Sequence, residues 1–202
     1  MATERTSQLL AAFKKTSVLR GRDLAALGFS RVLVSDAAKR GHIERIGRGL
    51  YTTKQAEVSE KHSYVQVARM TPNSVLCLLS ACRFHEITTQ NPHEVWFALG
   101  RKAWTPKITF VKTRIVRFSG LALTEGIEIH KCEGTELKVY SVAKTVADLF
   151  RYRNKFGLDV ALEALRDVLS SRRCTVDELM RFARMRHVAK VIEPYLTAYL
   201  AQ

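Results

Sequence analysis

The sequence of 202 residues lacks any long uninterrupted apolar run. No segment approaches the roughly 18 apolar residues that a membrane-spanning helix needs. The first residues, MATERTSQLL, contain no apolar stretch of the kind that signal peptides have. We therefore expect a cytoplasmic protein that has no membrane partner.

Cysteine is scarce and poorly spaced for a metal site. The four cysteines form no C-x-x-C pair. Cys77 and Cys82, with His85 nearby, resemble a ligand cluster, but on a helix the two thiols would point about 140° apart. Buried free thiols explain these residues better. The chain also has no phosphate-binding loop of the form G-x-x-x-x-G-K-S/T. The sequence predicts no metal, no cofactor and no enzyme.

Negative charge is scarce relative to positive charge. The chain has 33 Lys and Arg against 19 Asp and Glu, a net charge of +14. Residues 1–54 hold 11 basic and 4 acidic residues, so half of the excess lies in about a quarter of the chain. Such an excess favours phosphate backbones, membrane surfaces or acidic partners without choosing among them.

The pattern of residues 1–54 is helix, helix, helix, hairpin. Apolar spacing and capping residues predict three helices, over residues 6–15, 21–28 and 31–40, the third with Ser30 as its N-cap. Residues 42–53 predict two strands that are joined by a Gly-Arg-Gly turn. The expected core residues are Leu9, Leu10, Phe13, Leu24, Leu27, Leu33, Ala37, Ile43 and Ile46. This order predicts a winged helix-turn-helix domain.

Polar and basic side chains gather on the third helix and on the hairpin. At about 100° per residue, Arg31, Ser35 and Lys39 share one face of the helix. A winged helix lays this helix in the major groove of DNA, and its hairpin contacts the backbone or the minor groove. An arginine that begins the second helix can reach a phosphate. The predicted DNA-binding residues are Arg22, Ser30, Arg31, Ser35, Lys39, Arg40, Arg45 and Arg48.

Residues 55–202 predict a larger mixed domain, separated from the first by a polar linker over residues 54–60. The apolar patterns predict helices over 58–70 and 72–85, strands over 94–99, 107–112 and 113–118, and a hairpin over 127–141 that turns near Gly134. Four helical patterns follow, over 141–153, 158–169 and 175–183 and from about Pro194. The predicted fold class is α+β, a winged helix-turn-helix followed by a domain with a central β-sheet and C-terminal helices.

Two other functions compete with DNA binding by a regulator. A winged helix also serves as a protein-docking module. A metal-dependent nuclease would use Glu136 and Lys138, which stand one residue apart on a strand, as metal ligand and charge-stabilising lysine. Such an enzyme needs a second carboxylate, and only Glu125 or Glu128 is placed to supply it because no Asp occurs between residues 36 and 148. An isolated E-x-K pair is frequent on exposed strands, so the nuclease is the weaker hypothesis.

The sequence also predicts the surroundings of one acidic residue and of the two tryptophans. Asp148 lies on a helix near Arg151 and Arg153, and an ion pair with one of them is the expected role. Trp96 lies in the apolar strand EVWFAL and is expected in the core. Trp104 belongs to a basic, aromatic loop that would suit either a nucleic acid or a protein partner.

Four motifs occur in order along the chain: RGHIERIGRGLY, SVLCLLSACRFHEIT, VWFAL and VYSVAKTVADLFRYRNKFGLDVALEALRDVL. In this order the chain resembles the AbiEi family of antitoxins from type IV toxin–antitoxin systems. The resemblance extends from about Leu9 to Tyr199 and is most specific from Val139 to Leu169. The G-x-Y ending of the hairpin at Gly49 is shared by many winged helices and is less specific.

The resemblance implies a repressor that binds an operator of its own operon through the winged helix. It also implies a C-terminal domain, after Ser59, that counteracts a nucleotidyltransferase-like toxin, in many members without a stable complex. The implied DNA contacts fall on Arg31, Ser35, Lys39, Arg45 and Arg48. The family often caps its second helix with Thr or Ser, whereas Arg20 precedes Gly21 here, so Gly21 or another group must supply that cap.

Overall fold

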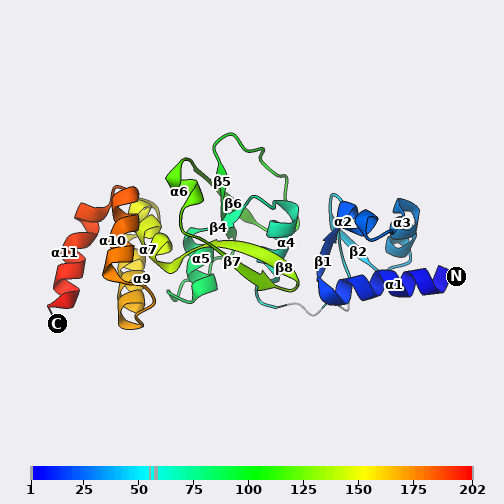
Figure 1. The fold of residues 1–202 in the computed structure, drawn as a ribbon, viewed down its shortest axis with the longest axis horizontal. Coiled ribbons are helices and arrows are strands. Elements are labelled where there is room, and N and C mark those ends of the chain that lie inside the picture. The colour runs from blue at the N-terminus through cyan, green and yellow to red at the C-terminus, as the bar shows by residue number, and fades with distance from the viewer. Residues whose placement is uncertain (1, 55, 57–58, 202) are drawn as a thin grey trace. The chain divides into compact units, whose positions relative to one another are not determined.

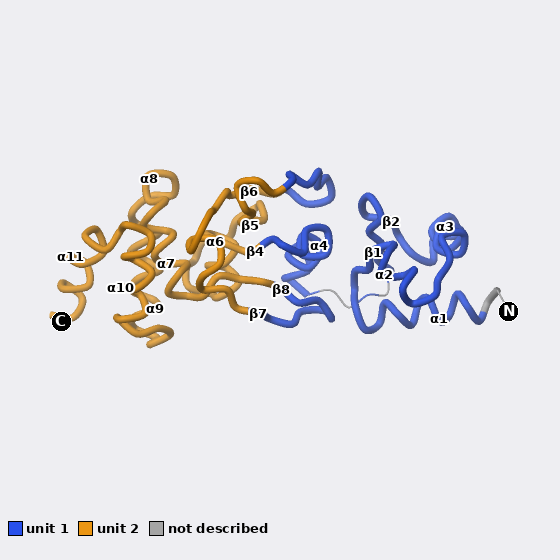
Figure 2. The backbone as a smooth tube through the Cα atoms, turned by 45° about the horizontal axis from the view of Figure 1, so that its top comes forward, with its two compact units in different colours: residues 1–74, 104–112, 129–137 blue, residues 75–103, 113–128, 138–202 orange. Residues whose placement is uncertain are grey.

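A computed structural model describes residues 2–54, 56 and 59–201 of the chain. Its contacts define two compact units, which Figure 2 shows in two colours: unit 1 comprises residues 1–74, 104–112 and 129–137, and unit 2 comprises 75–103, 113–128 and 138–202. Residues 55, 57 and 58 of the predicted linker lie outside the described residues. These units describe which residues pack together and not which residues share a function. The predicted functional division into residues 1–54 and 55–202 therefore stays a prediction.

The first part of unit 1 is a winged helix-turn-helix (Figure 1). Its elements are α1 (Ala2–Lys15), β1 (Val18–Arg20), α2 (Gly21–Ala26), α3 (Arg31–Lys39), β2 (Glu44–Gly47) and β3 (Leu50–Thr52), followed by α4 (His62–Met70). The strands form an antiparallel sheet in the order β1-β3-β2, with Leu19 and Arg45 both opposite Tyr51. The sequence predicted the hairpin, and β1 adds a third strand to it.

The core of the winged helix contains most of the apolar residues that the sequence placed there. Its fully buried members are Leu9, Phe13, Leu19, Leu24, Val34, Ala37 and Ile43. The prediction for Leu27 was wrong, because α2 ends at Ala26 and the Leu27 side chain is 58% exposed. The chain reverses at Gly28, whose φ of 84° suits glycine. Val34, rather than Leu33, supplies the buried side chain of α3 beside Ala37.

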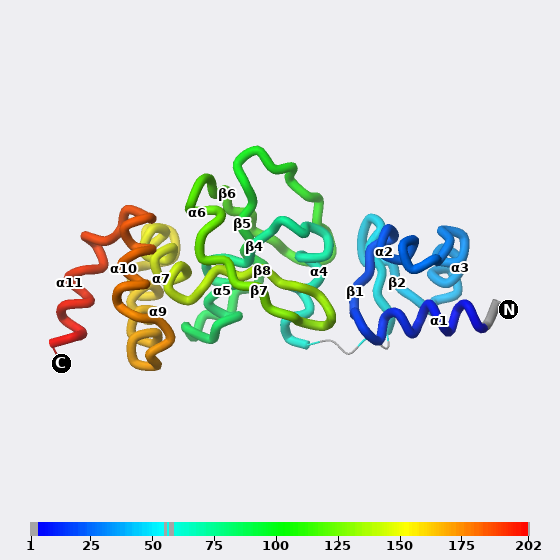
Figure 3. The backbone as a smooth tube through the Cα atoms, in the orientation of Figure 1, coloured from blue at the N-terminus to red at the C-terminus, as the bar shows by residue number. Residues whose placement is uncertain are grey.

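The remaining elements form an α+β arrangement, which confirms the predicted fold class. The sheet is built from β4 (Val75–Leu76), β5 (Val95–Gly100), β6 (Thr113–Phe118), β7 (Ile127–Cys132) and β8 (Thr135–Tyr140), in the order β6-β5-β4-β8-β7. The helices are α5 (Leu78–His85), α6 (Leu121–Thr124), α7 (Val142–Arg151), α8 (Arg153–Phe156), α9 (Leu158–Ser170), α10 (Val176–Met185) and α11 (Ala189–Leu200). Figure 3 follows the chain through these elements. Within the described residues, no helix is both long and apolar enough to cross a membrane.

Three predicted elements differ from the observed ones. The helix predicted over 72–85 begins as strand β4, which pairs with β5. Residues 107–112 form no strand, because β6 pairs with β5 from Thr113 opposite Val95 onward and leaves no partner for an earlier extension. The last helix begins at Ala189 and runs through Pro194. Thr175 caps α10 as predicted, accepting a hydrogen bond from Glu178 N at 3.1 Å.

Helix α7 occupies the centre of unit 2, and every residue from Val142 to Phe150 is buried. Its one carboxylate, Asp148, forms ion pairs with Lys144, at 2.6 Å, and with Arg186, the C-cap residue of α10. The predicted partners were wrong, since Arg153 donates instead to the Phe150 carbonyl at 2.9 Å. Burial lowers the pKa of Lys144, and Asp148 opposes this shift.

Removal of the Asp148 carboxylate should destabilise the fold strongly. Asp148→Ala leaves two buried cations without their partner, and we expect the free energy of unfolding to fall by about 3–5 kcal/mol. Glu193→Ala, at an exposed position of α11, is the matched control and should stay within about 0.5 kcal/mol. Urea unfolding followed by circular dichroism measures both changes. Equal stability of the two variants would contradict a structural role for the ion pairs.

Candidate nucleic-acid interface

Helix α3 presents one polar face to solvent. Val34 and Ala37 are buried, and this orientation leaves Arg31, Ser35 and Lys39 exposed on the opposite side, as predicted. Ser30 Oγ accepts a hydrogen bond from Leu33 N at 3.2 Å, so the predicted N-cap is confirmed. The helix therefore begins at a fixed residue, and its polar face has a defined direction.

Helix α2 is capped by a carboxylate from its own first turn. The backbone N–H of Arg20 donates to Asp23 Oδ2 at 3.1 Å, and the Arg20 guanidinium donates to both oxygens of the same carboxylate. Partial burial opposes ionisation of Asp23, but the bonds from Arg20 and the charge of Arg69 outweigh it and lower the pKa of Asp23. Asp23 thus accepts from the backbone N–H of the N-cap residue, while the first amide of the helix, Gly21 N, donates to the Gly49 carbonyl at 2.8 Å in place of a Ser or Thr side chain. Arg22, by contrast, has a side chain that is 69% exposed.

The turn between β2 and β3 is fixed at both of its glycines. Gly49 has a φ of 67°, and its carbonyl accepts a hydrogen bond from Gly21 N at 2.8 Å, which joins the turn to the start of α2. Arg45 Nε donates to the Gly47 carbonyl at 3.2 Å. The side chain of Arg48, between the two glycines, is exposed.

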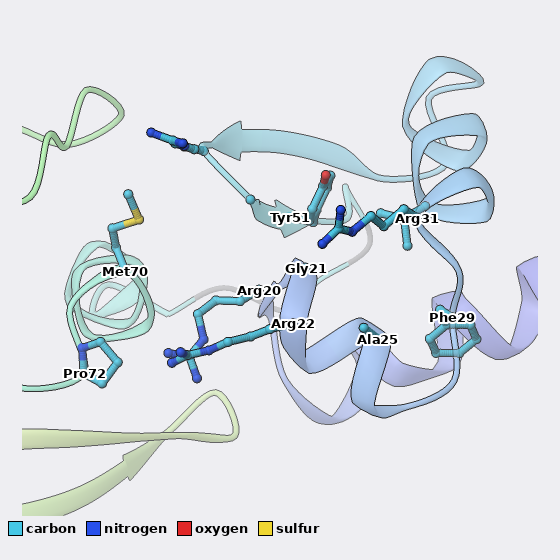
Figure 4. A pocket seen from close by; sticks show the side chains of 12 residues that line it. Arg20, Gly21, Arg22, Ala25, Phe29, Arg31, Tyr51, Met70 and Pro72 are labelled. Carbon is cyan, nitrogen blue, oxygen red and sulfur yellow. The ribbon is translucent and has the colours of Figure 1, made fainter.

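A cavity of about 730 Å³ opens where α2, α3 and this turn meet. Figure 4 shows Arg20 and Arg22 extending together from the start of α2, and Arg31 beside Tyr51. The lining residues are Arg20, Gly21, Arg22, Ala25, Phe29, Arg31, Val34, Arg48, Gly49, Tyr51, Met70 and Pro72. The structure thus brings together three of the predicted DNA-binding residues.

The other predicted residues do not line the cavity. Ser35 and Lys39 lie farther along the exposed face of α3, and Arg40 follows at its C-cap. Sequence reasoning missed Arg20 and Tyr51 as lining residues. Tyr51 has a detectable signal, because alternation along β3 places it on the face opposite the buried Leu50.

The charge of the cavity is positive despite Asp23. The single carboxylate of Asp23 is shared by Arg20, Arg69 and, at 4.0 Å, Arg22. One negative charge cannot balance these arginines together with the exposed Arg31 and Arg48, so the cavity retains an excess of positive charge. Guanidinium groups bind phosphate oxygens through paired hydrogen bonds. The geometry therefore suits an anionic ligand that is broad enough to contact α2, α3 and the turn at once.

Residues 7–54 match the family model described as transcriptional regulator, AbiEi antitoxin. We refer to residues 7–54, which are similar to this family, as the AbiEi-type domain. The crystal structure of the RV2827C protein from Mycobacterium tuberculosis is similar to this chain with a TM-score of 0.62 and 16% sequence identity, over 90% of this chain and 70% of that one. At this identity the likeness shows a shared fold. No curated protein matches the sequence.

Glu133, at the turn between β7 and β8, binds the AbiEi-type domain to the start of α4. Its Oε1 accepts hydrogen bonds from Ser59 N and Oγ at 2.7 and 2.8 Å, and its Oε2 accepts one from Ser17 Oγ. The same Oε2 lies 2.7 Å from His62 Nδ1. Burial opposes ionisation, but these hydrogen bonds hold the pKa of Glu133 below its ordinary value.

Arg69 of α4 makes a second connection between the same parts of unit 1. Its Nε donates to Thr135 Oγ1 at 2.9 Å, and its Nη2 donates to the Gly134 carbonyl at 3.3 Å. Its Nη1 lies 3.5 Å from Asp23 Oδ2, on α2. The carboxylate that caps α2 is therefore also bound to the β7–β8 hairpin through Arg69.

The groups proposed for metal chemistry do not assemble into a cluster. Cys77 and Cys82 are buried free thiols, and burial raises the pKa of each. Glu136 is exposed on β8, and Glu125 lies 3.9 Å from Arg181. The part of the chain that the structure describes contains no group of three or more His, Cys, Asp or Glu side chains suited to a metal ion.

Glu133 should give the fold a measurable pH dependence. Its pKa in the folded protein lies below the ordinary value of 4.5, so its ionised form stabilises the fold above that pH and this contribution is lost as pH falls through the lower folded value. Glu133→Gln should cost about 1–3 kcal/mol of unfolding free energy at pH 7. The difference from the parent should shrink below about pH 4.

Glu136→Gln, at an exposed position on the same hairpin, is the control for this measurement. Urea unfolding at pH 7, 5 and 3.5 gives the three free energies. A Glu133→Gln deficit that stayed constant with pH would rule out ionisation of Glu133 as its cause.

Proposed function

We propose that this protein is a non-enzymatic transcriptional repressor that binds double-stranded operator DNA through its AbiEi-type domain. The observation that carries the proposal is the convergence of Arg22, Arg31 and Arg48 on one open cavity beside the exposed polar face of α3. Three separate elements contribute these cations. A duplex that receives α3 in its major groove presents phosphates to both sides of the helix.

The proposed contacts divide by role. Ser35 and Lys39, along the face of α3, and Arg31, at its start, would meet base edges in the major groove. Arg22 and Arg48 would bind phosphates, and such contacts set register without reading sequence. Affinity would come mainly from phosphate neutralisation, so binding should weaken steeply with salt.

The remaining predicted residues have more limited roles in this proposal. Ser30 contributes chiefly as the N-cap that fixes the direction of α3. The Arg45 guanidinium donates to the Gly47 carbonyl and shapes the turn, while its remaining N–H groups face solvent or a phosphate. Arg40 adds positive charge at the end of α3.

The proposal extends to autoregulation and to antitoxin activity of the type IV class. The observation that supports it is the match of residues 7–54 to antitoxin regulators. The part after Ser59 would counteract a nucleotidyltransferase-like toxin encoded by a neighbouring gene. If the protein showed no salt-sensitive DNA binding, a protein-docking role for the winged helix would be favoured instead.

Single arginine substitutions should separate the two kinds of DNA contact. Arg31→Ala should lower the preference for the duplex upstream of the protein's own gene over a shuffled duplex, by about 1–3 kcal/mol. Arg48→Ala should weaken binding to both duplexes alike and lower the slope of log affinity against log salt by about 0.9. Fluorescence anisotropy with labelled duplexes at 50–200 mM KCl measures both effects.

Arg184→Ala, which removes one positive charge from α10, is the control for net charge. Parent-like binding by both Arg31→Ala and Arg48→Ala would show that the site assignment is wrong. Absence of any DNA binding by the parent would contradict the proposed function itself.

Antitoxin activity should be separable from DNA binding. A nucleotidyltransferase gene is expected beside this gene, and expression of that enzyme alone should arrest growth. Co-expression of the parent should restore growth, and so should co-expression of an Arg31→Ala, Arg48→Ala double variant, because neutralisation is assigned to the part after Ser59. Failure of the parent to restore growth would contradict the antitoxin assignment and leave the DNA-binding proposal to its own test.

A further inference from the structure

The chain from β5 to α6 is strongly and purely basic. Residues 95–124 include six Lys or Arg and no Asp or Glu. Two of the six have structural partners, since Arg114 Nε lies 2.7 Å from Glu94 Oε2 and Arg117 donates to the carbonyls of Gly100 and Ala103 at 2.8 Å. The charge of the remaining four is not explained by the fold.

Part of this segment, residues 104–112, belongs to unit 1 together with the AbiEi-type domain. Phe110 is its point of attachment. The ring lies directly on the backbone of β2 at Gly47, where an added Cβ would come within 2.8 Å of Phe110 Cε1. Real Cβ atoms do not approach so closely, so any larger residue at this position would displace the Phe110 ring. The segment is thus seated next to Arg48, the residue that follows Gly47.

The side chains on either side of this attachment face solvent. Lys107 and Lys112 are exposed, three residues before and two residues after Phe110. At no more than about 3.6 Å per residue, their Cα atoms lie within about 11 Å of Phe110. Trp104 is 74% exposed, whereas the other tryptophan, Trp96, is 7% exposed. Tryptophan is enriched at interfaces, because its large ring carries an N–H donor.

We propose that residues 104–112 form a second DNA-contacting element beside the β2–β3 turn. Lys107 and Lys112 bind phosphates that flank the one bound by Arg48, and Trp104 packs against the sugar–phosphate strand of the same duplex. The inference rests on the proposed function, since it extends the footprint of the AbiEi-type domain. Duplex DNA presents one charge per about 1.7 Å of its axis, so a duplex that contacts Arg48 also offers phosphates to adjacent lysines.

The seating of Phe110 favours DNA over an anionic membrane surface. Lysines with a tryptophan suit both kinds of partner. Phe110 holds the segment beside Arg48, so we expect its partner to contact Arg48 and the cavity as well. A duplex is long and uniformly charged, and it can contact the cavity and the segment together.

The first experiment measures the number of phosphates neutralised. A fluorescein-labelled 30-bp duplex of mixed sequence is titrated with the full-length protein at 50–200 mM KCl. The Lys107→Ala, Lys112→Ala variant should lower the slope of log affinity against log salt by about 1.8, since each phosphate contact contributes about 0.9. The control, Arg184→Ala with Lys190→Ala, changes net charge equally and should leave the slope at the parental value.

The second experiment tests the contact made by Trp104. In a Trp96→Phe variant, Trp104 is the remaining tryptophan, and acrylamide quenching of its fluorescence reports its exposure. Saturating duplex should reduce the quenching constant severalfold. Vesicles with 30% phosphatidylserine in phosphatidylcholine serve as the comparison and should leave it unchanged. A Trp104→Phe variant, in which Trp96 remains, should show no change with either addition.

The outcomes distinguish this inference from the function on which it rests. If Arg48→Ala weakens binding but the lysine variant keeps the parental slope and Trp104 stays quenchable, the segment does not contact DNA and the proposed function stands. Shielding of Trp104 by vesicles and not by duplex overturns the inference in favour of a lipid surface. If the parent does not bind duplex at all, both proposals fail.

Discussion

Repulsion among like charges is the constraint on which the DNA-facing surface depends. Arg22, Arg31 and Arg48 line one cavity, and in the absence of a polyanion each raises the energy of the others. The fold must therefore hold them by other means. Asp23 fixes the start of α2, the Gly21–Gly49 hydrogen bond fixes the turn, and Ser30 fixes the start of α3. The stabilisation from the helix caps, the turn and the core packing offsets the electrostatic repulsion among these surface arginines.

Three carboxylates have structural roles and are bound by partners within the fold. Asp23 and Glu133 lie in unit 1 and bind groups from elements that are distant in sequence. Asp148 lies in the core of unit 2 and neutralises two buried cations. None of the three lies free among the cavity arginines, where an exposed carboxylate would compete with a phosphate. In a chain with 33 basic and 19 acidic residues, the position of each acid therefore shapes the surface as much as the position of each base.

The sequence predicted the elements whose signals are local. Helical spacing and the capping residues Ser30 and Thr175 gave α3 and α10, and the glycines of the hairpin gave the turn before β3. The sequence did not predict side-chain contacts between residues that lie far apart along the chain. Asp148 finds Arg186, which lies 38 positions away, because α10 packs on α7, and no spacing rule contains that information. Glu133 and its partners are likewise joined only by the tertiary fold. For the candidate site, helical periodicity gave the face of α3, whereas the cavity lining from α2, the turn and α4 required the structure.

The interleaving of the two units has a consequence for synthesis of the chain. Unit 1 contains residues 1–74 but also needs 104–112 and 129–137, which carry Phe110 and Glu133. At about 5–20 residues per second, the ribosome adds residues 75–137 in roughly 3–13 s. Throughout that interval the nascent winged helix exists without the hairpin that binds Ser17 and Arg69. Neither unit is a continuous stretch of gene, so a single recombination breakpoint cannot transfer one of them intact to another protein.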